Sequence, residues 1–271
     1  MSKPEPEGVM NLHDGRLLTK EKARGVRNSG AANAGKRRAP APPTIAPIAH
    51  NVPLHELAYR SLRRALMSGR FHPGQKLSMR GVAEMLQVSP MPVRASLARL
   101  HAERALLLQA NGSAVVPTLD RERLKELMEL RILLEGQATA RAATRMTKAE
   151  LAEVDIRAKN LLAALKDTDV QRYMEANAEF KLFLYSCARA PVTLALIESL
   201  WLQHGPYMHR YGRGNHYQAQ RGITNVIINA LKACKPAEAR AAIRRDIRDG
   251  LNYLMATLEF ENQPVPRTVR T

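Results

Sequence analysis

The sequence predicts a mostly α-helical protein in which a small N-terminal domain precedes a larger helical domain. Composition is the first reason: only 4% of the 271 residues are aromatic, whereas 45% are hydrophobic and 25% charged, a balance that favours helix over sheet. The second is that apolar residues recur at helical spacing after about residue 50. The third is that glycines and prolines divide this part into pieces of ordinary helix length. The chain is long enough for two domains.

The first 49 residues are expected to be a disordered arm. They mix Lys, Arg, Gly, Asn and Ala, become proline-rich in RAPAPPTIAPIAH, and carry nine basic residues against four acidic ones. Such an arm either contacts DNA phosphates or is only a solvated tail. Residues 262–271 are expected to form a second tail.

Residues 50–118 are expected to form the first folded domain. Helices are predicted over residues 54–68, over 77–86, and from Pro90 or Met91 to about Glu103. Gln87, Val88 and Ser89 make the turn before the third helix, with Ser89 as its N-cap. Two short apolar runs, 105–108 and 114–116, flank a hairpin signal. Three helices followed by a hairpin form a winged helix-turn-helix.

The third helix is the expected DNA-reading element, because the second helix of a helix-turn-helix pair enters the major groove. Its inward face is predicted to be Val93, Leu97 and Leu100. Its outward face is predicted to carry Arg94, Ser96 and Arg99. Arg94 lies about one turn from the helix start, where its guanidinium can contact guanine or clamp a phosphate. The alternative is a solvated surface arginine.

The charge of the chain also indicates a nucleic-acid partner. The net charge is +17, which favours a polyanion: nucleic acid first, an anionic membrane surface second. Residues 50–118 hold nine basic residues against three acidic ones, whereas residues 119–271 hold 24 against 18. No apolar run approaches the roughly 18 residues of a membrane span, and no signal core is evident. Cys187 and Cys234 are expected to be buried reduced thiols in a cytoplasmic protein.

The segment PGQKLSMRGVAEMLQVSPMPVRASLARL, together with the hairpin ANGSAVV, resembles the GntR family of bacterial transcriptional regulators. The matching positions are Pro73, Gly74, Leu77, Ala83, Leu86, Val88, Ser89, Pro92, Val93, Arg94, Leu97, Leu100, Gly112 and Val115 or Val116. Three positions depart from the pattern: Met79 replaces an acid, Pro90 an arginine and Arg104 a glycine. The resemblance implies DNA contacts at Arg80 and Arg94, in a bacterial protein that joins the nucleoid when it is bound to DNA. The candidate DNA-binding set is Arg80, Ser89, Arg94, Arg99, Asn111 and Gly112.

Residues 119–261 are expected to form an all-α bundle of roughly six helices. The predicted helices span 119–145, 148–166, 169–187, 191–210, 217–233 and 236–260. Thr147 and Glu150 form a capping box. Pro191 and Pro236 stand where first-turn prolines belong.

The first of these helices, LKELMELRILLEGQATARAA, resembles the ligand-binding (FCD) domain of the FadR-like branch of GntR regulators. The branch carries an Arg and a Glu here, matched by Arg131 and Glu135. Arg131 lies in one stripe with Leu124, Leu127, Met128 and Leu134, and an arginine in an apolar stripe must pair or face a cavity. Arg131 therefore binds a carboxylate effector, or forms a salt bridge with Glu135 one turn away, or does both.

Many members of this branch bind a divalent metal through an Asp and three His, and this chain lacks that set. Asn177, Lys181, Thr224 and Asp246 stand at the four places. Lysine is a poor metal ligand whose charge repels the ion, so neither a metal nor another cofactor is expected. With Arg131 these four are the candidate effector-binding residues. Lys181 either supplies positive charge for an anionic effector or is a solvated lysine. The histidines of this region, His204, His209 and His216, are expected in a loop.

The combined prediction is a homodimeric, DNA-binding transcriptional regulator that recognises a double-stranded operator. Repression is favoured over activation, with operator affinity modulated by a small organic-acid effector. The alternative is an effector-independent or partner-controlled regulator whose bundle is only a dimerisation scaffold. An enzyme is not expected, because no nucleophile–base pair, phosphate loop or metal cluster is evident. No membrane partner is expected either.

Overall fold

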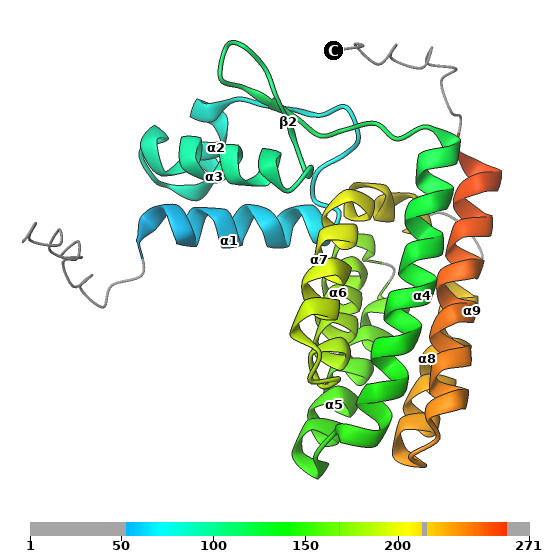
Figure 1. The fold of residues 1–271 in the computed structure, drawn as a ribbon. Helices are drawn as coiled ribbons and strands as arrows, with labels where there is room; N and C mark the ends of the chain where they lie inside the picture. Colours follow the sequence, from blue (N-terminus) through cyan, green and yellow to red (C-terminus); the bar gives the residue numbers. More distant parts are fainter. Residues whose placement is uncertain (1–52, 168, 213–215, 259–271) are drawn as a thin grey trace, which may run out of the picture. The chain divides into compact units, whose positions relative to one another are not determined.

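A computed structural model describes residues 53–167, 169–212 and 216–258 (Figure 1). The predicted arm over residues 1–49 and the predicted tail over 262–271 lie outside these ranges. The described residues are mostly helical, as expected. None of their helices is long and apolar enough to cross a membrane.

The N-terminal domain has the predicted three helices and hairpin. Its helices are α1 (Leu54–Met67), α2 (Met79–Leu86) and α3 (Pro90–Ala102), and its strands are β1 (Lys76–Leu77), β2 (Leu107–Leu108) and β3 (Ala114–Val115). The strands form an antiparallel sheet in the order β1-β3-β2.

One predicted boundary in this domain is wrong. The second helix was expected from Leu77, but Leu77 pairs with Ala114 in the sheet, and α2 begins at Met79. Ser78 is the N-cap, and its Oγ accepts a hydrogen bond from the Gly81 backbone N–H at 3.0 Å. Pairing with the hairpin and a good capping residue together move the boundary by two residues.

The core of the N-terminal domain forms where α3 packs against α1. Val93, Leu97 and Leu100 are buried, as predicted. Ser96 was predicted to face outward, but it is only 1% exposed. Its Oγ lies 2.8 Å from the Pro92 carbonyl oxygen and 3.0 Å from that of His55, and these two acceptors share its one proton. Because backbone carbonyls satisfy the hydroxyl, serine can lie in this interface at little cost.

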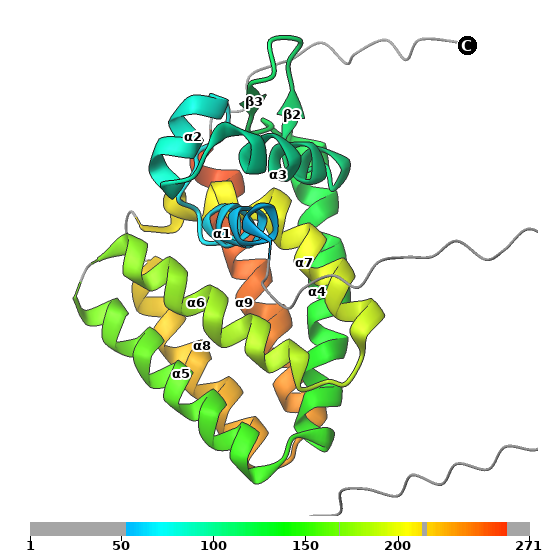
Figure 2. The ribbon, with the colours of Figure 1, turned by 90° about the vertical axis from the view of Figure 1, so that its left-hand side faces the viewer.

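The C-terminal domain is a helical bundle. Its elements are α4 (Arg121–Arg145), α5 (Lys148–Lys166), α6 (Val170–Ser186), α7 (Pro191–His204), the 3-10 helix η1 (Gly205–Gly212), α8 (His216–Lys232) and α9 (Pro236–Thr257). The long helices α4 and α9 lie side by side (Figure 1). Helix α5 lies beside α6 and α8 (Figure 2).

Local sequence signals mark the starts of α5, α7 and α9. The capping box between Thr147 and Glu150 is present at the start of α5, and Pro191 and Pro236 occupy the first turns of α7 and α9. The helix predicted over residues 191–210 ends at His204, and a 3-10 helix follows. Cys187 is buried as expected, whereas Cys234 is exposed, contrary to the expectation.

Helix α1 packs closely against the end of α7. A Cβ added at Gly205 would lie 2.1 Å from the Leu66 carbonyl oxygen, so only glycine fits there without a shift of backbone. An ion pair of 2.9 Å joins Arg63 of α1 to Glu198 of α7. The start of η1 is therefore tied sterically to α1.

Candidate functional site

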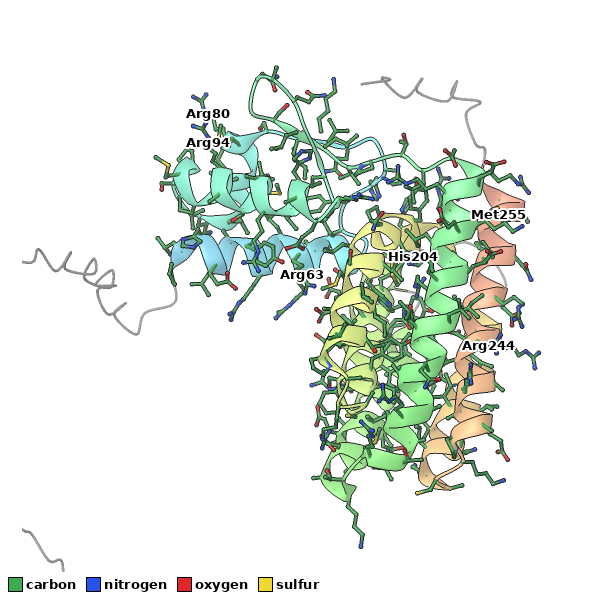
Figure 3. All side chains as sticks on the ribbon, in the orientation of Figure 1. Arg63, Arg80, Arg94, His204, Arg244 and Met255 are labelled. Carbon is green, nitrogen blue, oxygen red and sulfur yellow. The ribbon has the colours of Figure 1, made fainter. Side chains whose placement is uncertain are left out.

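Two exposed arginines lie on the helix-turn-helix. Arg80 is in the first turn of α2 and Arg94 is near the start of α3. Neither forms an ion pair with another described residue. Figure 3 shows both on the side of this domain opposite to Arg63 of α1. Uncompensated, exposed arginines on α2 and α3 are suited to phosphate oxygens and guanine edges.

The N-terminus of α3 adds to this face. Ser89 is the N-cap, as predicted, but its exposed side chain makes no capping hydrogen bond. Gln87 supplies the left-handed turn between α2 and α3, with φ of 54°. A helix N-terminus with a spare hydroxyl favours a phosphate group. Met91 follows within the first turn and is 76% exposed.

The wing tip is built by Asn111 and Gly112. Gly112 has φ of 77°, a conformation that L-residues rarely adopt. The Asn111 Oδ1 accepts hydrogen bonds from the Ser113 backbone N–H at 3.0 Å and from the Ser113 Oγ at 2.7 Å. A Cβ on Gly112 would be 3.4 Å from the Met79 Cε, so the tip lies beside the start of α2. Asn111 therefore shapes the turn.

Arg99 is not brought together with Arg80 and Arg94. One of its nitrogens bonds the Glu56 carboxylate at 2.8 Å and another lies 3.4 Å from Glu103. Its guanidinium carbon lies 3.6 Å from the centre of the Tyr59 ring, a cation–π contact. Two of the three acids of this domain are thus held between α1 and α3. The pKa of Glu56 is lowered, chiefly by its hydrogen bond from Arg60.

A second group of interest is buried inside the bundle. Its polar members come from α4, α6, α7, α8 and α9: Arg131, Glu135, Thr139, Asn177, Lys181, His204, Thr224 and Asp246. The Glu135 Oε1 accepts hydrogen bonds from the Arg131 Nε at 2.6 Å and from the Trp201 Nε1 at 2.9 Å. Its Oε2 accepts one from the Tyr185 hydroxyl. The ion pair that was one interpretation of Arg131 is therefore present.

Two of the other candidate residues, Lys181 and Asp246, form a second ion pair in the same cluster. The Lys181 Nζ bonds the Asp246 Oδ2, and their side chains are only 7% and 2% exposed. Asn177 and Thr224 are also buried. The Asn177 Oδ1 and the Asp246 Oδ1 have no hydrogen-bond partner among the described residues. Lys181 is thus not a solvated lysine.

Electrostatic effects connect the two ion pairs. Burial lowers the pKa of His204 well below its usual value, and the charges of Arg131 and Lys181 lower it further, so this imidazole is neutral at physiological pH. Burial raises the pKa of Tyr185 well above its usual value, and the carboxylates of Glu135 and Asp246 add to the effect. The pKa values of His204 and Tyr185 are therefore each shifted by charges from both ion pairs.

These residues do not fit a divalent metal. Such an ion prefers imidazoles and carboxylates. The four places expected from the resemblance offer one carboxylate, one amide, one hydroxyl and an ammonium already bonded to the carboxylate. Among the described residues, no three His, Cys, Asp or Glu side chains are grouped so that they could hold a metal.

The sequence pattern missed several members of the cluster. His204 was expected in a loop, but it is the buried last residue of α7 (Figure 3). His209 lies in η1, with its Nδ1 2.8 Å from the Pro206 carbonyl oxygen. The side chain of His216 lies outside the described residues. Trp201 and Tyr185 were also not singled out, and the only signal for Trp201 was that it is the single tryptophan of the chain.

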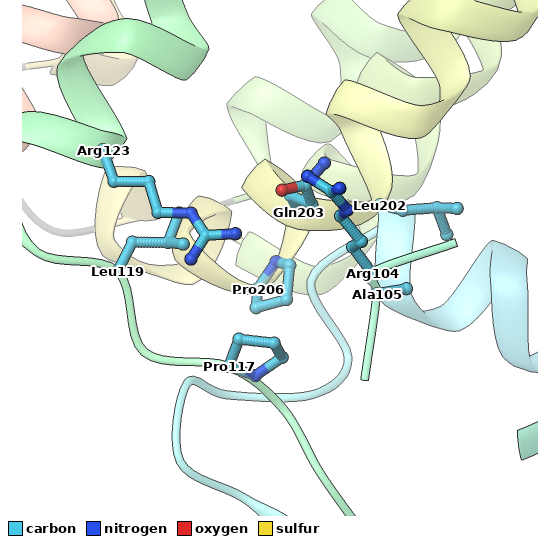
Figure 4. Close-up of a pocket in the computed structure, with 8 residues that line it drawn as sticks. All are labelled: Arg104, Ala105, Pro117, Leu119, Arg123, Leu202, Gln203 and Pro206. Atoms are coloured by element: carbon cyan, nitrogen blue, oxygen red, sulfur yellow. The ribbon is translucent and has the colours of Figure 1, made fainter. Parts of the chain in front are cut away.

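A separate small pocket lies where the end of the wing meets α4, α7 and η1 (Figure 4). It is lined by Arg104, Ala105, Pro117, Leu119, Arg123, Leu202, Gln203 and Pro206. Its volume is about 10 Å³, close to what one water molecule needs. It is too small for a metabolite.

Comparisons with known proteins agree with this architecture. The model of the bacterial regulatory proteins of the gntR family matches residues 54–116, and that of the FCD domain matches residues 126–249. The HTH-type transcriptional regulator McbR of Escherichia coli (strain K12) is 31% identical over 175 residues, which are 64% of this chain and 79% of that protein.

Solved structures give the same result. The structure of E. coli McbR/YncC has a TM-score of 0.71 and 27% identity, covering 76% of this chain and 99% of that one. A GntR regulator from Rhodococcus sp. RHA1 has a TM-score of 0.62 at 20% identity, covering 76% and 99%, and shows the fold alone. The chain therefore belongs to the GntR family of bacterial transcriptional regulators, in the branch with a C-terminal FCD domain, whose members bind DNA and are not enzymes.

Proposed function

We propose that this regulator binds a double-stranded operator as a homodimer and represses transcription by occupying it. The observation that carries the DNA-binding mode is the pair of exposed, unpaired arginines, Arg80 and Arg94, on α2 and α3. Arg94 reads a base edge, and Arg80 and the Ser89 hydroxyl hold phosphates. Asn111 and Gly112 shape the wing, which contacts the sugar-phosphate backbone of the DNA beside α2.

Arg99 has a supporting role in this proposal. Its bonds to Glu56 and Glu103 and its contact with Tyr59 fix α3 on α1. Exposed Met91, beside Pro90, presents an apolar group at the start of α3. Apolar side chains contact the thymine methyl, so this chain uses methionine near the place where the family pattern has an arginine.

Selection from a random DNA pool tests the operator-binding proposal. The purified protein should enrich one sequence with two inverted half-sites. Enrichment of no sequence, or of a single unrepeated half-site, would contradict it.

The homodimer is proposed to form through α4 and α7. These neighbouring helices expose large apolar side chains: Leu130 at 42%, Leu133 at 55%, Val192 at 75% and Leu196 at 52%. The charges of α4 suit antiparallel pairing with a second copy. Exposed Glu126 and partly exposed Arg141 lie about equally far on either side of Leu133, so a two-fold axis near Leu133 would place each opposite the other.

Sedimentation of a charged variant tests this interface. Leu133→Glu should convert the dimer to a monomer, because it buries an unpaired carboxylate. Val226→Glu is the matched control, since Val226 is 51% exposed on α8. The proposal fails if Leu133→Glu remains dimeric, or if the control dissociates equally.

A small organic acid is proposed as the effector, acting at Arg131, Asn177, Lys181, Thr224 and Asp246. Because both cations already hold carboxylates, the effector carboxylate would replace Glu135 on Arg131 or Asp246 on Lys181. Burial favours the protonated form of the displaced carboxyl group, which keeps the charge of the cluster balanced.

Helix α7 would carry the change to the DNA-binding domain. Trp201 bonds Glu135, and Glu198, one turn earlier, bonds Arg63 of α1. Gly205 is pressed against the Leu66 carbonyl. Loss of the Trp201 bond would shift α7 and hence α1, which changes the relative placement of the two DNA-binding domains in the dimer.

The second candidate function is a regulator whose bundle only dimerises. The ion pairs of Arg131 with Glu135 and of Lys181 with Asp246 favour it, because each cation already has an anion. A thermal-shift screen of mono- and dicarboxylic acids separates the two candidates. An acid that raises Tm in the wild type but not in Arg131→Gln, and that weakens operator binding, supports the effector. A screen without any such acid supports the scaffold.

A further inference from the structure

The centre of the bundle contains a cation that belongs to the protein itself. The Lys181 side chain reaches from α6 to the Asp246 carboxylate on α9, and both are almost completely buried. Asn177, one turn before Lys181, lies on the same face of α6. These are three of the four places at which a metal-binding FCD domain would carry its ligands.

The ammonium group leaves no charge for a metal to neutralise. Asp246 is the one carboxylate of the four positions, and Lys181 already compensates it. A divalent ion near Asp246 would meet an ammonium within the same low-dielectric interior, where like charges repel strongly. The guanidinium of Arg131 and the Glu135 carboxylate cancel in the same way.

We propose that the Lys181 ammonium is a permanent, protein-borne replacement for the divalent cation of this site. Any acidic ligand of the cluster is then held directly by Lys181 and Arg131, without an intervening metal. This goes beyond the proposed function, because it concerns the cation of the site and holds whether or not the site controls DNA binding.

Two unsatisfied acceptors indicate that the rest of the site could still take a metal. The Asn177 Oδ1 and the Asp246 Oδ1 are buried without a hydrogen-bond partner among the described residues. If lysine alone excludes the ion, exchange of Lys181 for histidine and Asn177 for aspartate should create a site. One imidazole and two carboxylates form a donor set that suits Zn²⁺ and Mn²⁺.

The first test uses the full-length wild type. Elemental analysis after dialysis should find no stoichiometric divalent metal, and Zn²⁺, Mn²⁺, Ni²⁺ or a chelator should leave Tm unchanged. About one metal per chain that disappears in Asp246→Asn would overturn the proposal. This measurement decides even if the variants below do not fold.

The second test uses the double variant Asn177→Asp/Lys181→His. Zn²⁺ or Mn²⁺ should raise its Tm by several degrees, since a ligand that binds only the folded state stabilises it, and titration calorimetry should give about one site per chain. Asn177→Asp/Lys181→Leu, which lacks the imidazole, is the matched control and should bind at least tenfold more weakly. A folded double variant without a metal response would show that these positions do not converge on a metal-sized site, and would overturn the proposal.

Operator binding of the wild type, measured in parallel, keeps the two proposals separate. It should be the same in the presence of a chelator and of added Mn²⁺. Loss of DNA binding under every condition would contradict the proposed function, while the metal measurements would still decide the role of Lys181.

Discussion

A double-mutant cycle on Arg131 and Glu135 measures the strength of the pair at the centre of the bundle. Their side chains are 4% and 0% exposed, with 2.6 Å between the Arg131 Nε and the Glu135 Oε1. Arg131→Met leaves the Glu135 carboxylate buried without its cation. Glu135→Gln leaves the guanidinium buried without its anion, while an amide oxygen remains for Trp201 and Tyr185.

Each single change should lower the free energy of unfolding by about 3–5 kcal/mol, the usual cost of one uncompensated buried charge. For a fold of this size each kcal/mol corresponds to roughly 2–4 °C in Tm, so both variants should melt far below the wild type. The double variant Arg131→Met/Glu135→Gln removes both charges. It should be more stable than either single variant, because replacing a buried pair is often close to neutral.

Urea unfolding followed by circular dichroism provides the free energies, and equal m-values show that the same surface unfolds in each variant. The coupling energy should be at least about 2 kcal/mol, within the range seen for residues in direct contact. Additivity of the two single changes would refute the account, because Arg131 would then owe its burial to something other than Glu135.

Three further changes test other parts of the structure. Between about pH 6.5 and 5 the unfolded chain takes up a proton at His204 that the folded protein, with its lowered pKa, does not. Stability should therefore fall with falling pH by up to about 1.4 kcal/mol per unit, and His204→Gln should flatten this slope; an unchanged slope would contradict the burial of a neutral imidazole. Arg104 has φ of 59°, a left-handed conformation that glycine adopts without strain, so Arg104→Gly should raise the free energy of unfolding by roughly 0.5–1 kcal/mol. A lower free energy of unfolding in calorimetry would show that the contacts of the arginine side chain outweigh this strain. Gly205→Ala should lower Tm and increase proteolysis of the α1–α7 junction, since its Cβ would meet the Leu66 carbonyl; unchanged values would show that this contact yields easily.

Local signals in the sequence determined much of the fold. The three helices and hairpin of the N-terminal domain, the burial of Val93, the capping box at Thr147 and the first-turn prolines were all predicted. These features depend on neighbours within a few residues. The left-handed conformation at Arg104 also explains why the family pattern has glycine at this position, since glycine adopts it without strain.

Features that depend on distant partners were not predictable in the same way. The pattern of α3 predicts that Ser96 faces solvent, because the His55 carbonyl of α1 that accepts its hydrogen bond lies 41 residues away in the chain. The ion pair of Arg99 with Glu56 and its contact with Tyr59 involve residues of α1, which the pattern of α3 alone does not reveal. Lys181 and Asp246 stand 65 residues apart in the chain, and helical periodicity does not reveal that they pair.

The affinity of Arg94→Ala for the selected operator shows whether α3 reads the DNA sequence. It should be measured at fixed salt, alongside Arg64→Ala, a matched loss of charge at an exposed arginine of α1. Arg94→Ala should lose about 1–3 kcal/mol of specific affinity and relax discrimination at one base pair, while Arg64→Ala should keep the preference of the wild type. Equal operator affinity and base preference in wild type and Arg94→Ala would contradict the assignment of α3 as the reading helix.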